Sequence, residues 1–174
     1  MDPVSSESHQ SSPTSTPAGR VLVVDDESSL RHLLRLILER SGHSVVEAAN
    51  GAEALQKLEQ DEHITVVFCD IRMPRMDGIA FLDVVRTRPL RVVMMSAYGT
   101  AETAVDAVSR GAYDYIAKPF RTDEIRACMN RISDLVRLEN ENRELRKRVE
   151  HGEELAGFIG RDPRTQQVME IVRR

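Results

Sequence analysis

The sequence predicts an α/β fold in which five parallel strands form a doubly wound sheet and a long helix follows. Two observations support this fold class. Short runs rich in valine and isoleucine alternate with segments of helical periodicity, which is the pattern of βαβ units. The run at 64–69 is apolar at nearly every position, as expected for a strand that helices cover on both faces.

Each strand is predicted from a β-branched run, and each helix from apolar residues at helical spacing. The predicted strands are 21–24, 45–48, 64–69, 91–95 and 113–117. The predicted helices carry their apolar residues within 30–38, 52–58, 78–86 and 100–110. A last helix begins near Thr122 and meets no stop signal before Gly152, which predicts about thirty residues, or about 45 Å of helix.

Length and composition allow one globular domain with appendages. The chain has 174 residues, of which 41% are hydrophobic and 30% are charged. The formal charge of −4 argues against a nucleic-acid surface over the whole molecule. No apolar stretch approaches the ~18 residues that span a bilayer, and no signal peptide pattern opens the chain, so we expect a cytoplasmic protein without a membrane partner. Cys69 and Cys128 lie in apolar patterns and are expected to be buried thiols.

The segments of the chain differ in composition. Residues 1–19 are rich in serine and proline and hold little that can be buried, which predicts a disordered leader. We expect the globular domain at 20–134 and a helical dimerisation linker at 135–152. The last stretch, 153–174, is interpreted as the start of a further domain.

The expected linker carries a short heptad pattern. Leu135, Leu138, Leu145 and Val149 fit positions a and d, and Asn142 falls at an a position, where a buried asparagine favours a parallel dimer in register. Only about two heptads are present. The alternative is a solvated helix whose many charged residues form ion pairs.

Residues able to do chemistry stand at the ends of four predicted strands. They are Asp25, Asp26, Asp70, Ser96 and Lys118. The carboxyl ends of parallel strands converge on one edge of an open sheet, which predicts a single shared site. Three neighbouring aspartates repel one another unless a cation neutralises them, and Mg²⁺ suits a few carboxylates together with water and a phosphate oxygen. Simpler interpretations are that Asp26 caps the following helix and that Lys118 is solvated.

Four motifs, in this order, resemble the receiver domain of a two-component response regulator over residues 20–134. They are VVDDE at 23–27, FCDIRMPRMDG at 68–78, MSAYG at 95–99 and GAYDYIAKPF at 111–120. The resemblance implies a flavodoxin-like sheet with strand order 2-1-3-4-5. Residues 96–105 further resemble the NtrC type, whose output is an AAA+ ATPase acting on sigma-54 RNA polymerase. Phe158-Ile159-Gly160 resembles the start of that ATPase domain.

The resemblance implies a phosphoacceptor site. Asp70 would take a phosphoryl group from a sensor histidine kinase. Lys118 and the Ser96 hydroxyl would contact phosphoryl oxygens, with serine standing where threonine is common. The implied ligands of Mg²⁺ are Asp25, Asp26, Asp70 and the backbone carbonyl of Arg72. A cis bond between Lys118 and Pro119 is implied as well.

The resemblance also implies a switch and partners. Phosphorylation would draw Ser96 inward, and Tyr115 would move into the vacated space. The alternative for Tyr115 is a half-buried strand aromatic with its hydroxyl at the surface. The face formed by the fourth helix, the fifth strand and the last helix would, together with the linker, carry a homodimer. DNA and sigma-54 RNA polymerase would be contacted only through further domains.

Two alternatives belong to other classes of protein. An aspartyl phosphatase of the haloacid-dehalogenase sort also uses an aspartate at a strand end, but its second acid is missing because position 72 is arginine. An interaction module would leave the pocket vestigial and work through the helix at 135–149. The sequence holds no Gly-x-x-x-x-Gly-Lys-Ser/Thr loop for ATP hydrolysis. We therefore expect no enzyme activity beyond Mg²⁺-dependent phosphorylation and dephosphorylation of the domain itself.

Overall fold

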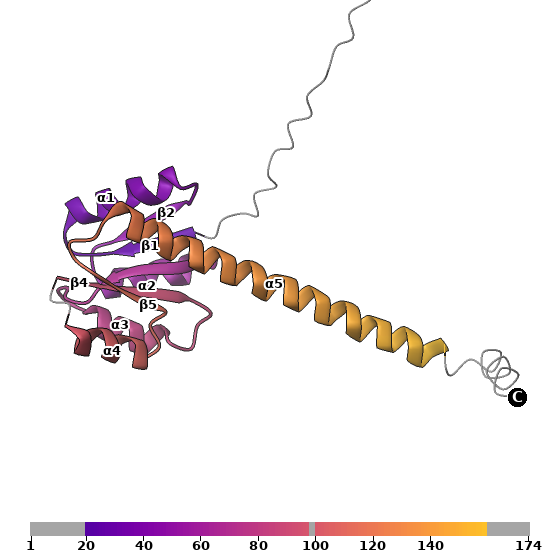
Figure 1. Ribbon diagram of the computed structural model, residues 1–174. Coiled ribbons are helices and arrows are strands. Elements are labelled where there is room, and N and C mark those ends of the chain that lie inside the picture. The colour runs from indigo at the N-terminus through magenta and orange to yellow at the C-terminus, as the bar shows by residue number, and fades with distance from the viewer. Residues whose placement is uncertain (1–19, 98–99, 160–174) are drawn as a thin grey trace, which may run out of the picture. The chain divides into compact units, whose positions relative to one another are not determined.

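The computed structural model of the chain describes residues 20–97 and 100–159. Within these residues strands and helices alternate, as Figure 1 shows. The elements are β1 (Arg20–Val24), α1 (Ser28–Arg40), β2 (Val45–Ala48), α2 (Gly51–Gln60), β3 (Ile64–Asp70), α3 (Gly78–Val85), β4 (Arg91–Ser96), α4 (Ala101–Ser109), β5 (Asp114–Ala117) and α5 (Thr122–Ile159). The expected leader at 1–19 and residues 160–174 of the expected further domain lie outside the described residues.

The five strands form one sheet in the order β2-β1-β3-β4-β5, and every neighbouring pair is parallel. This arrangement confirms the predicted fold class and strand order. A helix follows each strand, because parallel neighbours need a crossover connection. The strand boundaries differ from the predicted ones by one residue or less at each end.

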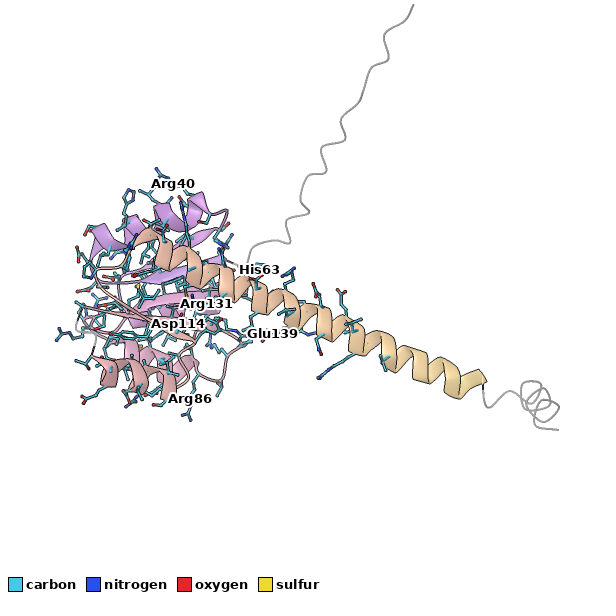
Figure 2. The ribbon with its side chains drawn as sticks, in the orientation of Figure 1. Arg40, His63, Arg86, Asp114, Arg131 and Glu139 are labelled. Atoms are coloured by element: carbon cyan, nitrogen blue, oxygen red, sulfur yellow. The ribbon has the colours of Figure 1, made fainter. Side chains whose placement is uncertain are left out.

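Helices cover the sheet on both faces. Alternate strand residues Leu22, Val67 and Met94 pack in one cluster with residues of α2, α3 and α4 such as Ala54, Phe81 and Ala107. The residues between them point to the opposite face. On the three central strands that face is buried as well, as are Leu34, Ile37 and Leu38 of α1 and Ile125 and Cys128 at the start of α5. Charged residues such as Arg40, His63 and Arg86 remain exposed (Figure 2).

The register of the sheet brings the polar strand ends to one edge. Val24 pairs with Cys69, and the next residues along the two strands are Asp25 and Asp70. Asp70 is level with Met95 of β4, and Ser96 is level with Ala117 of β5. The predicted convergence of Asp25, Asp70, Ser96 and Lys118 therefore follows from the strand pairing alone.

The turn after β3 depends on a glycine at the first position of α3. The N–H of Gly78 donates to the carbonyl of Ile71 at 2.8 Å, which folds the chain back over the end of the strand. A Cβ atom at this position would overlap the carbonyl oxygen of Asp70 and would lie 2.9 Å from Met94 Cε. The close approach of α3 to the site thus requires a residue without a side chain.

We expect Gly78→Ala to lower the free energy of unfolding by about 3 kcal/mol, the upper end of the cost of overpacking, because the atom it crowds is a backbone oxygen. This loss exceeds the ~1 kcal/mol that alanine gains over glycine in a helix. Urea denaturation measures the change. The matched control is Gly42→Ala, where φ is 87° and nothing lies within 4 Å of an added Cβ, so only the ~1–2 kcal/mol of left-handed backbone strain is expected. A Gly78→Ala protein as stable as the parent would contradict the close packing.

The last helix is longer than predicted. We expected it to stop at Gly152, but α5 continues through Gly152 and Gly157 to Ile159. Each glycine costs only about 1 kcal/mol against alanine, and the residues after Gly152, namely Glu153, Glu154 and Leu155, favour helix. The internal contacts of the chain define two compact units, one ending at Cys128 and the other beginning at Met129. The first residues of α5 therefore belong to the first unit, and the rest of the helix belongs to the second.

Two further expectations concern burial and membranes. Cys69 and Cys128 are free, buried thiols, which confirms the prediction for both. In the described part of the chain, no helix combines the length and the apolar character that crossing a membrane requires.

Candidate functional site

Three aspartates meet at the carboxyl edge of the sheet. Asp25 and Asp26 follow β1, and Asp70 ends β3. Each offers one carboxylate oxygen, and these oxygens lie within 4.8 Å of one another. Asp25 and Asp70 are buried, whereas Asp26 is exposed. The cluster therefore joins a buried acidic pair to an acid that solvent can reach.

Asp26 does not cap the helix that follows it. The N-cap of α1 is Glu27, and no side chain caps this helix end. Within residues 20–97 and 100–159, the Asp26 carboxylate has no hydrogen-bond or ion-pair partner. The simpler interpretation of Asp26 as a cap is wrong, and its carboxylate is available to a ligand.

Lys118 bridges the two buried acids. Its Nζ lies 2.6 Å from Asp25 Oδ2 and 2.8 Å from Asp70 Oδ1, and only 12% of its side chain is exposed. The backbone N–H of Lys118 donates to the Ser96 carbonyl at 2.7 Å, which ties the end of β5 to the end of β4. The bond to Pro119 is cis, as the resemblance implies. Lys118 is thus held inside the acidic cluster and is not a solvated lysine.

One ammonium group does not neutralise this cluster. Burial, with a smaller contribution from the charge of Asp25, raises the pKa of Asp70, whereas the hydrogen bond and charge of Lys118 lower it, and the net shift is upward. Burial lowers the pKa of Lys118, but its hydrogen bonds to Asp25 and Asp70 and their charges outweigh that effect, so the net shift is upward. The upward shifts of both pKa values are consistent, because Lys118 is stabilised by two carboxylates, whereas Asp70 shares the charge of Lys118 with Asp25.

The charges fit a divalent cation. Three carboxylates face one ammonium, which leaves two negative charges at the cluster. Mg²⁺ usually keeps several of its waters and binds only a few carboxylates. A small cluster of carboxylates at an edge that solvent reaches suits this ion. The backbone N–H of Arg72 donates to the Asp70 carboxylate. The Arg72 carbonyl as a metal ligand stays a prediction.

Two other predicted residues border the cluster. Ser96 is 5% exposed and ends β4 beside the Lys118 backbone. Tyr115 is half-buried on β5, and its hydroxyl is buried without a hydrogen-bond partner among the residues that the structure describes. The alternative that placed this hydroxyl at the surface is therefore wrong.

Sequence reasoning missed Arg31. Its guanidinium donates to the backbone carbonyl of Asp25 at 2.7 Å. A weak signal was present, because Arg31 lies near the N-terminal end of α1, where the helix dipole disfavours a cation. A positive charge that the helix dipole disfavours, a few residues after Asp25 and Asp26, indicates that Arg31 makes a specific compensating contact.

A parallel sheet with a lysine-bridged acidic cluster at its carboxyl edge defines a class of α/β domain, and comparison with known proteins identifies the family. The model of the response regulator receiver domain matches residues 21–130. The chain belongs to this family.

Sequence relatives and a solved structure also support membership of the receiver family. The chain is 38% identical to chemotaxis protein CheY of Bacillus subtilis over 117 residues, which are 66% of this chain and 97% of that protein. It is 38% identical over 158 residues to the C4-dicarboxylate transport transcriptional regulatory protein DctD of Rhizobium meliloti, covering 90% of this chain and 33% of that protein. The beryllofluoride-activated NtrC4 receiver domain dimer gives a TM-score of 0.61 at 33% identity, covering 65% of this chain and 94% of that chain.

The match to larger regulators is partial in length. The chain spans 29% of the length of the NtrX-like response regulator of Rickettsia bellii, to which it is 39% identical. It covers 28% of regulatory protein AtoC of Escherichia coli at 42% identity. The receiver family is thus established, and any output of a larger regulator is a matter for proposal.

Proposed function

We propose that this receiver domain is the phosphoacceptor of a two-component response regulator and takes a phosphoryl group from a sensor histidine kinase onto Asp70. The observation that carries the proposal is the position of the Asp70 carboxylate. It lies in the acidic cluster with Asp25 and Asp26 and 2.8 Å from Lys118. The proposed nucleophile, the carboxylates able to hold a cation and a fixed positive charge thus lie in one cluster.

The transfer needs little rearrangement of the chain. A carboxylate oxygen of Asp70 attacks the phosphorus, the O–P bond forms as the N–P bond breaks, and the imidazole leaves with the electron pair. The Lys118 ammonium moves from the Asp70 carboxylate to a phosphoryl oxygen, and the Ser96 hydroxyl donates a hydrogen bond to another phosphoryl oxygen. Asp25, Asp26, Asp70 and the Arg72 carbonyl would hold Mg²⁺, whose charge would lower the repulsion between the anionic carboxylate and the phosphoryl group.

The switch involves Ser96 and Tyr115. A phosphoryl group adds roughly −1.5 to −2 charge units and draws Ser96 toward it. The Tyr115 hydroxyl is buried without a partner in the described part of the chain, and an unsatisfied buried hydroxyl costs about 1–3 kcal/mol. A shift that gives this hydroxyl a partner is therefore favourable, which makes Tyr115 a movable group on β5.

The output passes through a homodimer of α5, with a contribution from the face of α4, β5 and α5. Leu138, Leu145 and Val149 at the heptad positions are 57–60% exposed, so their apolar surface is available to a second copy. The NtrC4 receiver that resembles this chain is a dimer in its beryllofluoride-activated form. We infer that the dimer drives an AAA+ output on sigma-54 RNA polymerase, with DNA contacted by further domains.

Sedimentation with and without beryllofluoride and Mg²⁺ tests the proposal. We expect the two additives together to change the dimer fraction, and neither alone to do so, because occupation of Asp70 needs both. Asp70→Asn removes the response. Sustained turnover of a phosphomonoester would instead favour the phosphatase. A dimer indifferent to both additives would favour the interaction module.

A further inference from the structure

Arg31 makes a bridge that the proposed reaction does not use. From α1 it reaches back to the strand end, where one guanidinium nitrogen lies 2.7 Å from the backbone carbonyl oxygen of Asp25. Its Nε lies 3.4 Å from Oε2 of Glu47 on β2, and 17% of its side chain is exposed. A largely buried guanidinium thus links the acidic turn to the neighbouring strand.

The position of this cation is costly without compensation. It lies near the N-terminal end of α1, which repels positive charge, and burial removes water from the guanidinium. Glu47 supplies one negative charge. The pKa of Glu53 is lowered mainly by the Ala49 N–H, and the charge of Arg31 is the smallest of the causes that lower it. Glu47 therefore offsets the charge of Arg31, and what Arg31 adds beside Asp25 is a directed hydrogen bond.

The bond completes the fixation of Asp25. The Asp25 N–H donates to the Ala48 carbonyl at 3.1 Å, and Asp25 Oδ1 accepts from the Glu27 N–H at 2.9 Å. Lys118 holds the other carboxylate oxygen. The carbonyl that Arg31 binds belongs to the peptide group joining Asp25 to Asp26. A rotation of this peptide group moves the Asp26 side chain relative to Asp25 and Asp70.

Asp26 depends on this peptide group more than the other acids do. In the described residues its carboxylate has no partner of its own, and it is exposed. Its backbone alone keeps it near the other two carboxylates. The orientation of the Asp25–Asp26 peptide group therefore affects where the Asp26 carboxylate lies relative to Asp25 and Asp70.

We propose that Arg31 is a positioning residue, which holds the Asp25–Asp26 turn in the geometry that binds the divalent cation. This inference rests on the proposed function, because it assumes that the acidic cluster binds Mg²⁺. A cation near the cluster also repels Mg²⁺, so a role of Arg31 through its charge alone predicts tighter Mg²⁺ binding when Arg31 is removed. The sign of the change on removing Arg31 distinguishes orientation from charge.

The test is a Mg²⁺ titration of the whole chain, without any phosphoryl donor, followed by amide chemical shifts of residues around the cluster. We expect Arg31→Met to weaken Mg²⁺ binding about tenfold, which is the lower end of the loss seen when a group that orients a metal ligand is removed. Arg31→Lys, with a single ammonium that cannot serve both Asp25 and Glu47, is expected to weaken it by roughly threefold. If the methionine variant does not fold, the lysine variant carries the test.

The matched control is Arg35→Met. Arg35 also pairs with Glu47, at 3.5 Å, and with Glu39, but it makes no contact with Asp25. We expect its Mg²⁺ affinity to stay at the parent value. An unchanged or tighter affinity of Arg31→Met, or an equal loss in Arg35→Met, would overturn the inference. If the parent chain does not bind Mg²⁺, or if Asp26→Asn leaves binding unchanged, it is the proposed cation site that fails.

Discussion

Asp70→Asn is expected to abolish modification by acetyl phosphate and, at the same time, to make the folded domain more stable by about 1 kcal/mol. The asparagine keeps the shape of the side chain but cannot form an acyl phosphate. It also removes one of two buried carboxylates that share a single lysine. Lys118 then pairs with Asp25 alone, and the repulsion between the two acids disappears.

The sign of the stability change follows from the pKa of Asp70. Burial raises it above its ordinary value of 3.8. The folded state therefore binds more protons than the unfolded state between 3.8 and the raised value, and stability falls as the pH rises through this range. At neutral pH the parent carries the full cost of the ionised carboxylate. The advantage of the asparagine variant is thus present at pH 7 and declines toward pH 3.8.

Urea denaturation of both proteins between pH 4 and pH 7 measures this difference, and mass spectrometry after incubation with acetyl phosphate and Mg²⁺ measures the modification. The control is Asp83→Asn, which breaks an exposed pair with Arg110 at 3.2 Å and is expected to change stability by less than about 1 kcal/mol. If Asp70→Asn were less stable than the parent at pH 7, the ionised Asp70 would be a net stabilising group. That outcome would contradict the electrostatics of the pocket.

The fold and the place of the site follow from short-range features of the sequence. The apolar runs determine where the strands lie, and a parallel sheet has one carboxyl edge, so Asp25, Asp70 and Lys118 had to converge. Their direct contacts need more than this rule. That one lysine bridges two acids depends on the path of the chain after β5, which strand periodicity does not describe.

The features that the sequence did not reveal depend on tertiary contacts or on small energy differences. The Arg31 bond to the Asp25 carbonyl spans α1 and the strand end, and no local pattern specifies it. The burial of the Tyr115 hydroxyl depends on how neighbouring elements pack around β5. The extension of α5 past Gly152 reflects a glycine cost of about 1 kcal/mol, which favourable neighbours can overcome.

Lys118→Met is expected to lower the free energy of unfolding by roughly 2–3 kcal/mol in the absence of Mg²⁺. Breaking a fully buried ion pair costs about 3–5 kcal/mol, and the edge of the sheet is partly open to water, which reduces the cost. The methionine leaves Asp25 and Asp70 close together without their shared cation. The matched control is Lys57→Met, which removes an exposed pair with Glu53 at 3.5 Å and should cost less than about 0.5 kcal/mol.

Mg²⁺ should recover much of the stability that Lys118→Met loses. A ligand at free concentration L that binds only the folded state stabilises it by RT ln(1 + L/Kd), which grows with its affinity, and the variant presents the cation with a more negative cluster of carboxylates. Urea denaturation in EDTA and in saturating Mg²⁺ is therefore expected to show a larger Mg²⁺-dependent gain for the variant than for the parent. The same gain in both proteins would mean that the lysine and the divalent cation do not act on the same carboxylates. That result would contradict the proposal that Asp25, Asp26 and Asp70 form a cation site for phosphorylation of this domain.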